Sequence, residues 1–173
     1  MSETLPPVVK RPSVPTYGIP DTLDGTLPWS WAEARLAAAE TYWFATTRPD
    51  GRPHLMPIWA AWCADPAWFE GGRLTRRARN LAANPAITVG IELPGDGALI
   101  AEGMCARLAG PPDGLAEQLV AAFAKYAGPP RGYVVDPANW SRPDGGIWAV
   151  TPRIVFGWSS FPADATRWRF DEA

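Results

Sequence analysis

The alternation of hydrophobic and polar positions predicts a chain built mainly of short β-strands. Aromatic and β-branched runs are separated by clusters of Gly, Pro, Asn and Asp, which are the residues that form turns. A turn at 48–51 joins two of these runs into a hairpin, and a turn at 94–97 joins two more. Strands are predicted over residues 42–47, 53–63, 68–70, 87–93, 98–108, 147–151 and 153–158, followed by a short tail around Trp168.

Helices are predicted in three further segments, and the first and the last of them repeat apolar residues at helical spacing. The first begins with a capping-box pattern of Ser30 and Glu33 and is expected to end near Glu40. The others are predicted over 76–83 and 115–126, and each ends at a pair that contains proline. Hairpins with helices between them, rather than strict strand–helix alternation, predict a mainly β, α+β fold: an antiparallel sheet or small barrel with helices at its side.

The chain of 173 residues has the length of one domain with an arm before it. Residues 1–28 hold six prolines and little apolar periodicity, so we expect a Pro-rich extended N-terminal arm without secondary structure. Residues 29–173 are then a single domain. The Gly- and Pro-containing segment 129–146 is long for a loop, which favours a lid or a segment that faces the substrate.

Composition excludes several classes of partner. The formal net charge of −2 gives no global positive field, so we expect neither nucleic acid nor an anionic membrane as a partner. The sequence has no apolar run long enough for a membrane span and no secretory signal, which favours a cytoplasmic protein. Two cysteines and one histidine cannot form a Cys/His zinc site, and the ten tryptophans suit a core and a subunit interface.

Four arginines lie within seven residues of the segment 73–79. Because the start of a helix already carries partial positive charge, this placement indicates a bound anion, and a phosphate is the anion that fits best. Thr75 could cap the helix, and Arg76 and Arg77 could hold the phosphate with planar guanidinium groups. An ordinary solvated basic face is the alternative.

The second informative segment, 50–62, places Pro53 and Pro57 in one predicted strand. A central, fully paired strand cannot accept two prolines, so Pro57 marks an edge, a bulge or a stretch of backbone that faces a ligand. His54 is the only side chain that titrates near neutrality, and it is either a proton donor or a structural group. The sequence lacks nucleophile-elbow, phosphate-loop and dinucleotide motifs, so an organic cofactor must carry any reaction.

These segments resemble the split-β-barrel flavin and deazaflavin oxidoreductases, which are similar to pyridoxamine 5'-phosphate oxidase. The residues that carry the resemblance extend from about 30 to 170 and lie at 44–54, 57–59, 75–81, 84–85, 102–103 and 166–170. The resemblance implies a six-stranded antiparallel split β-barrel with flanking helices. It also implies a homodimer with FMN or the deazaflavin coenzyme F-420 at the subunit interface, and the choice between the two stays open.

The resemblance also implies which residues bind the cofactor. A phosphate side is expected at Thr75, Arg76, Arg77 and Asn80, and a ring side along His54, Met56, Pro57, Ile58 and Trp59. Arg167 and Trp168 resemble an element that the second subunit contributes. Many relatives that bind the deazaflavin have lysine where this chain has Arg77. The chain also lacks the longer C-terminal elements of true pyridoxamine phosphate oxidases, which argues against vitamin B6 oxidation.

The leading hypothesis is therefore an oxidoreductase that exchanges a hydride with a small, conjugated organic substrate, with His54 as a candidate catalytic residue that donates a proton or hydrogen bond. The alternative is a non-catalytic barrel that stores or senses a flavin or haem, for which His54 is the only imidazole available as an axial ligand. A third hypothesis is an interaction scaffold that uses its tryptophans.

Overall fold

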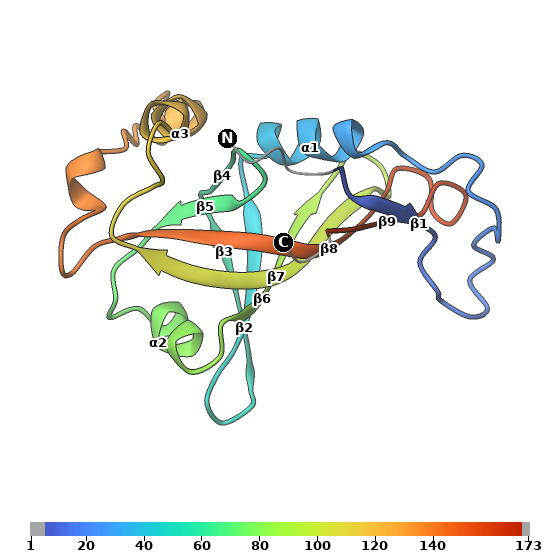
Figure 1. The fold of residues 1–173 in the computed structure, drawn as a ribbon, viewed down its shortest axis with the longest axis horizontal. Coiled ribbons are helices and arrows are strands. Elements are labelled where there is room, and N and C mark those ends of the chain that lie inside the picture. The colour runs from blue at the N-terminus through green and yellow to red at the C-terminus, as the bar shows by residue number, and fades with distance from the viewer. Residues whose placement is uncertain (1–5, 171–173) are drawn as a thin grey trace.

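A computed structural model describes residues 6–170. Figure 1 shows a twisted sheet with α1 and α3 on one side and α2 on the other. Over the described residues the elements are β1 (Val8–Lys10), α1 (Trp29–Ala38), β2 (Tyr42–Thr47), β3 (Pro53–Ile58), β4 (Ala61–Trp62), β5 (Ala67–Glu70), α2 (Arg76–Ala83), β6 (Ala86–Glu92), β7 (Ala98–Leu108), α3 (Ala116–Phe123), η1 (Ala124–Tyr126), η2 (Pro137–Asn139), β8 (Ile147–Trp158) and β9 (Thr166–Arg169).

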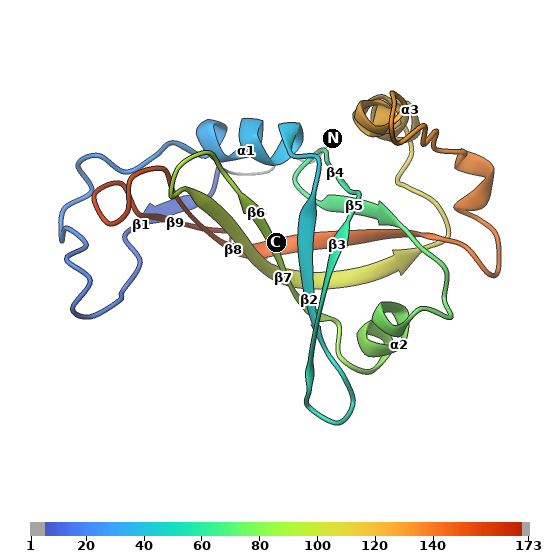
Figure 2. The ribbon, with the colours of Figure 1, turned by 180° about the vertical axis from the view of Figure 1, so that it is seen from behind.

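The strands are paired antiparallel in the order β1-β9-β8-β7-β6-β2-β3, and β5 joins β4 to the first half of β8. The two predicted hairpins are therefore confirmed as β2–β3 and β6–β7. The hairpin of β2 and β3 extends beyond α2, as Figure 2 shows from behind. Six strands form a split barrel when β3 and β4 are counted as one interrupted strand: β2, β3 with β4, β5, β6, β7 and β8. The barrel is split between β3 and β4.

The split lies at Trp59 and Ala60, which interrupt the strand expected over 53–63. Before the interruption the strand pairs with β2, and after it the strand pairs with β5. Tyr126 fills the gap: its hydroxyl accepts a hydrogen bond from Ala60 N at 3.1 Å and donates one to Ala60 O at 2.7 Å. A side chain thus satisfies the backbone groups that a neighbouring strand would otherwise pair.

The prediction of two closing strands is wrong, because β8 runs without a break through Pro152. The register between β7 and β8 shifts between Glu102 and Gly103, so a bulge absorbs the proline. A Cβ atom at Gly103 would lie 2.1 Å from Thr151 O, so only glycine permits this close approach of the two backbones.

The helices lie close to their predicted ranges, but one predicted cap is absent. The helix over 76–83 is confirmed residue for residue as α2, and the third predicted helix divides into α3 and the 3₁₀ turn η1. The predicted capping box is wrong: α1 begins at Trp29 after Pro28, and no side chain caps it. At the C-terminal end of α1, free carbonyl groups bind Lys125, whose ammonium donates to Ala37 O at 3.0 Å and to Ala39 O.

The proline-rich arm lies against the C-terminal part of the chain. Contrary to the expectation of no secondary structure, Val8–Lys10 form β1, which pairs with β9. Arg11 fastens the next residues, because its guanidinium donates to Ala163 O at 3.0 Å and to Ala165 O at 2.9 Å. Proline removes the backbone donors that a longer strand would need, so β1 stays short.

Two apolar clusters form the core. The larger one fills the barrel under α1, and the smaller one lies under α3, where Leu119, Phe123 and Tyr126 are fully or almost fully buried. Five of the ten tryptophans are buried, and Trp168 has no exposed surface, so the core uses a large share of them. No helix within residues 6–170 is long and apolar enough to cross a membrane.

We predict that Tyr126→Phe destabilises the protein at the split between β3 and β4. The substitution keeps the ring but leaves the N–H and C=O of Ala60 buried without partners, which should lower the free energy of unfolding by about 2–4 kcal/mol. Urea unfolding followed by circular dichroism measures this loss. Tyr17→Phe is the control, because Tyr17 is 59% exposed and its change should stay within about 0.5 kcal/mol. Equal midpoints for the two variants would contradict the prediction.

Candidate functional site

The strand β3 is the free edge of the sheet and pairs only with β2 among the described strands. Its side chains are unusually open for a strand, with Leu55 60% exposed, Met56 38% and the adjoining Trp59 42%. Pro57 lies in this strand, which confirms the prediction that it marks an edge. The backbone of β3 is thus available to a ligand along its outer edge.

At one end of β3 stands the beginning of α2. Thr75 is the N-cap, as predicted: its hydroxyl accepts a hydrogen bond from Ala78 N at 3.1 Å and donates one to Gly72 O at 3.0 Å. Arg76 follows it and is exposed, so its guanidinium and the free N–H groups of the first turn can reach an anion together. The structure therefore offers the donor set that a phosphate needs.

Arg77 is placed differently from Arg76. It is 7% exposed and lies over the Phe69 ring, with its Cζ 4.5 Å from the ring centroid. Gly71 makes room for it, since a Cβ atom there would lie 2.5 Å from Arg77 Nη2. Burial lowers the pKa of this guanidinium. Arg77 thus supplies charge from beneath the surface and supports the start of α2 by packing.

Asn80 connects α2 to the β2–β3 hairpin. It is fully buried, and its Nδ2 donates to Thr46 Oγ1 at 3.0 Å. That hydroxyl lies 3.5 Å from His54 Nδ1, at the limit of a hydrogen bond. Among the described residues, Asn80 Oδ1 has no hydrogen-bond partner. The arrangement assigns Asn80 to positioning the helix beside His54 rather than to open contact with a ligand.

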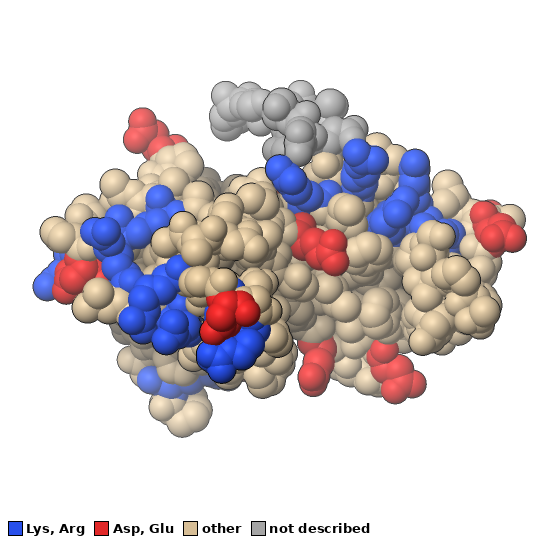
Figure 3. Space-filling view, turned by 90° about the horizontal axis from the view of Figure 1, so that it is seen from below, with Lys and Arg blue, Asp and Glu red and all other residues tan. Residues whose placement is uncertain are grey.

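The charges that act on His54 are positive. Its pKa is lowered by burial and by the nearby charges of Arg48, Arg76 and Arg77. Figure 3 shows Lys and Arg side chains gathered on the part of the lower surface where α2 and the hairpin lie. Although the whole protein carries a formal net charge of −2, this end of β3 attracts anions.

The other end of β3 opens into a hollow of about 260 Å³ lined by Pro57, Ile58, Trp59, Glu70 and Tyr133. Trp59 stacks on Tyr126 with ring centroids 5.5 Å apart and touches Tyr133 at 5.6 Å. Because a strand rises about 3.3 Å per residue, this hollow lies roughly 16 Å from the Pro53 end. That separation matches an elongated ligand with a phosphate at one end and a ring at the other.

The segment 129–146 contributes to this hollow. Tyr133 lines it, and Trp140, which is 2% exposed, donates a hydrogen bond from Nε1 to Glu70 Oε1. Arg107 anchors the far end of the segment by bonding Gly145 O at 2.8 Å. Tyr133 therefore brings the segment to the hollow, and the buried Trp140 holds it in place. That the segment is a lid or faces a substrate stays a prediction.

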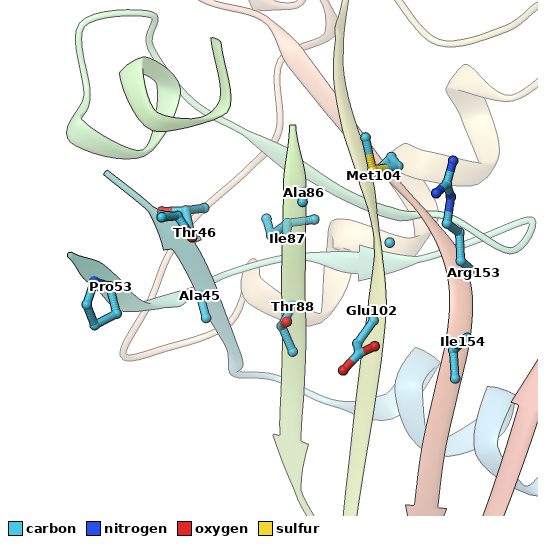
Figure 4. Close-up of a pocket in the computed structure, with 12 residues that line it drawn as sticks. Ala45, Thr46, Pro53, Ala86, Ile87, Thr88, Glu102, Met104, Arg153 and Ile154 are labelled. Carbon is cyan, nitrogen blue, oxygen red and sulfur yellow. The ribbon is translucent and has the colours of Figure 1, made fainter. Parts of the chain in front are cut away.

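A second hollow, of about 420 Å³, lies on the outer face of the sheet across β2, β6, β7 and β8. Figure 4 shows Thr46 and Pro53 at its hairpin side, with Thr88, Glu102 and Arg153 projecting from the neighbouring strands. Sequence reasoning did not assign Thr88 or Arg153 to a site, because no local pattern distinguishes them from ordinary outward positions of strands. It also missed Glu70. The sequence offered one sign of it, a single carboxylate at the end of the otherwise apolar strand β5.

Two predicted residues lie elsewhere. Arg167 and Trp168 belong to β9, which lies at the opposite end of the molecule from α2 (Figure 1). Trp168 has no exposed surface and packs edge-on against Trp29 with ring centroids 5.7 Å apart, so its side chain is committed to the core and is not available to a cofactor. Arg167 is half-buried on the other face of the same strand.

No group of three His, Cys, Asp or Glu side chains that could hold a metal ion occurs within residues 6–170. The polar groups that the structure does bring together are those at the two ends of β3: Thr75, Arg76, Arg77, Asn80 and His54 at one end, and Glu70 at the other. They can bind an anion, orient a flat ring along the strand and place one imidazole near the anion.

Comparison with solved structures supports the fold. An F-420 reductase is 24% identical, with a TM-score of 0.54 over 71% of this chain and 94% of its own. A conserved hypothetical protein from Mycobacterium tuberculosis is 21% identical, with a TM-score of 0.62 over 79% of this chain and 87% of its own. The haem storage protein HutZ from Vibrio cholerae is 17% identical, with a TM-score of 0.53 over 71% and 88%. At these identities the likeness establishes the fold alone.

The sequence comparison identifies the family. No curated protein matches the chain significantly. The model of the pyridoxamine 5'-phosphate oxidase family, however, matches residues 31–158, which is nearly three quarters of the chain. This match covers every strand of the barrel together with α2, so the predicted resemblance and the predicted split-barrel α+β fold are both confirmed. The chain belongs to the pyridoxamine 5'-phosphate oxidase family.

Proposed function

We propose that this protein is an oxidoreductase that binds a flavin-type cofactor, FMN or coenzyme F-420, along the free edge of β3. One observation carries the proposal: a capped helix start with the exposed Arg76 stands beside His54 at one end of this strand, and an aromatic hollow opens at the other. Membership of a family of cofactor-binding barrels and likeness to an F-420 reductase support it.

The residues present fit the phosphate of such a cofactor. The first-turn N–H groups of α2 and the Arg76 guanidinium supply hydrogen bonds, and Arg48 and Arg77 add positive charge around His54. Within the described residues none of these three arginines takes part in a salt bridge. An anion at this place would therefore relieve the mutual repulsion of the cations.

The ring end of β3 supports the rest of the proposal. When bound, a flavin-type ring supplies hydride transfer, so the protein needs only to bind, orient and shield it. Pro57, Ile58 and Trp59 line the hollow there and exclude water from one side. His54 lies on the phosphate side, and its lowered pKa keeps the imidazole neutral near pH 7, so it serves as a hydrogen-bond partner.

We further propose that the protein acts as a homodimer with a small-molecule substrate. The outer face of β2 and β3 exposes Trp43, at 38%, and Leu55, at 60%, which a second copy could cover. Dimerisation would also close the outer hollow of Figure 4 and complete a cofactor site between subunits.

Haem storage or sensing is the second candidate, because HutZ shares the fold. The chain has one histidine, and its imidazole lies among three arginine charges, an environment suited to an anion rather than to an axial ligand of haem. A Soret band after equilibration with haemin, lost in His54→Ala, would favour this candidate.

The test of the main proposal is equilibration of the purified full chain with FMN and with F-420, followed by fluorescence anisotropy. We expect one of them to bind at micromolar concentration or tighter. The reduced complex should then transfer hydride to a quinone or dye faster than free reduced cofactor does. Absence of binding for both cofactors would overturn the proposal, and binding without turnover would leave only a storage or sensing role.

We predict that Arg76→Ala and Arg77→Ala separate binding from stability. Arg76→Ala should weaken cofactor binding by about ten- to a hundredfold, the equivalent of about 1.5–3 kcal/mol for a charge-assisted bond. Arg77→Ala should weaken it less, because the Arg77 guanidinium is buried and acts on the cofactor through its charge. Arg76→Ala should leave the melting temperature of the empty protein unchanged or slightly raised, because a cation leaves a positive helix end. Arg77→Ala should lower it, since the guanidinium packs on Phe69.

Calorimetry of the empty proteins and anisotropy titrations of the cofactor measure the two effects of these arginine variants. Arg169→Ala is the matched control, because Arg169 is an exposed arginine on β9, far from α2. Unchanged cofactor affinity in both Arg76→Ala and Arg77→Ala would mean that the segment is a solvated basic face.

We predict that anion binding raises the pKa of His54. The free protein holds this pKa below its usual value, and an anion among the arginines offsets their charge. Binding is then coupled to proton uptake, so affinity for the anion increases as the pH falls between the raised and the lowered pKa. Sulfate is the probe because its own charge is constant over this range.

The single imidazole makes the measurement direct, since one Cε1 proton signal in the NMR spectrum belongs to His54 once any tag is removed. The pKa of His54 should rise when sulfate is added. In Arg76→Ala, the pKa of His54 without sulfate should already be higher than in the unaltered chain. A His54 titration that responds to neither change would contradict the proposed anion site.

A further inference from the structure

The hollow at the Trp59 end of β3 has a chemical character opposite to that of the α2 end. Four of its five lining residues, Pro57, Ile58, Trp59 and Tyr133, are apolar or aromatic, and Glu70 is the only carboxyl among them. The volume of about 260 Å³ suits one or two fused rings rather than a large molecule. A single carboxylate in such a wall selects the polar edge of whatever ring binds there.

The Glu70 carboxyl is held in place but is not saturated. Trp140 Nε1 donates to Oε1, and within residues 6–170 this is the only hydrogen bond or ion pair of the side chain. Oε2 can therefore accept a hydrogen bond from a ligand. Burial raises the pKa of Glu70, and the nearby charge of Asp136 acts in the same direction. None of the residues that line the hollow is a cation, so a second carboxylate beside Glu70 is disfavoured.

The aromatic wall is held rigidly. Trp59 lies nearly parallel to Tyr126, at 17°, with ring centroids 5.5 Å apart, and Tyr126 is itself fixed to the backbone of Ala60. Tyr133 approaches Trp59 from the loop side. Because Trp59 is still 42% exposed, it keeps a surface against which a flat ring can pack.

We propose that Glu70 accepts a hydrogen bond from an N–H group at the edge of a planar conjugated ring that packs against Trp59. This inference deepens the proposed function and rests on it: the ring is either that of the cofactor or that of a substrate beside it. In both cases the recognised chemistry is the same, a flat ring with an N–H donor or an amidinium-like cation. A ring that presents a carboxylate at this edge is rejected by Glu70 and Asp136.

Three probes of the same shape test the charge preference: benzamidinium, benzamide and benzoate. Calorimetric titration of the full chain should give affinities in that order, with at least about a tenfold difference between the first and the last. Glu70→Gln should weaken the binding of benzamidinium by about tenfold and remove the order of affinities among the three probes. Glu70→Asp, which keeps the carboxylate, should keep that order. Trp59→Ala should weaken all three probes alike.

Glu92→Gln is the matched control, because Glu92 is an exposed glutamate at the end of β6 and should leave the order unchanged. Urea unfolding confirms that each variant is folded. An order of affinities that is the same in Glu70→Gln as in the unaltered chain, or a preference for benzoate, would overturn the inference.

Saturation with FMN or F-420 separates the two sources of the ring. If the cofactor displaces benzamidinium, Glu70 contacts the ring of the cofactor; if the probe stays bound, Glu70 contacts a substrate. Failure of both cofactors to bind, with the charge preference of Glu70 intact, would refute the proposed cofactor while the donor preference of the hollow stands.

Discussion

The hydroxyl of Tyr126 between the N–H and the C=O of Ala60 is the contact on which the site depends. Without it, two buried backbone groups lose their partners at the point where the strand leaves β2 and joins β5. The interruption is what frees β3 as an edge and turns Trp59 towards the loop 129–146. A side chain from the turn after α3 thus satisfies the backbone at the split and stacks on Trp59, which lines the hollow.

The two ends of β3 differ in charge. Arginine charges gather at the hairpin end, where α2 begins, and the Glu70 carboxyl lines the hollow at the other end. Because the two ends are about 16 Å apart, the charges act on different parts of one elongated ligand. This division, rather than any single reactive side chain, is what makes the site suited to a phosphate-bearing molecule with a ring.

Residues of one type have different roles according to burial. Arg76 and Arg77 are neighbours in sequence, yet one faces solvent and the other lies on Phe69 in the space left by Gly71. Trp59 and Trp168 likewise differ, since one borders a hollow and the other fills the core. Residue type alone therefore does not show which arginine or tryptophan lies at the surface and which lies in the core.

The sequence by itself determined the local elements: both hairpins, the limits of α2, its Thr75 cap and the edge position of β3 all follow from turn residues, helical spacing and proline. It also determined the family, through segments whose order spans the barrel. The tertiary structure decided what depends on contacts between distant residues. Tyr126 meets Ala60, Lys125 binds carbonyl groups at the C-terminal end of α1, and a bulge at Gly103 lets β8 pass through Pro152. Glu70 and Trp140 are 70 positions apart, and only folding brings them together, because hydrogen bonds and packing act over ångströms in space and not along the chain.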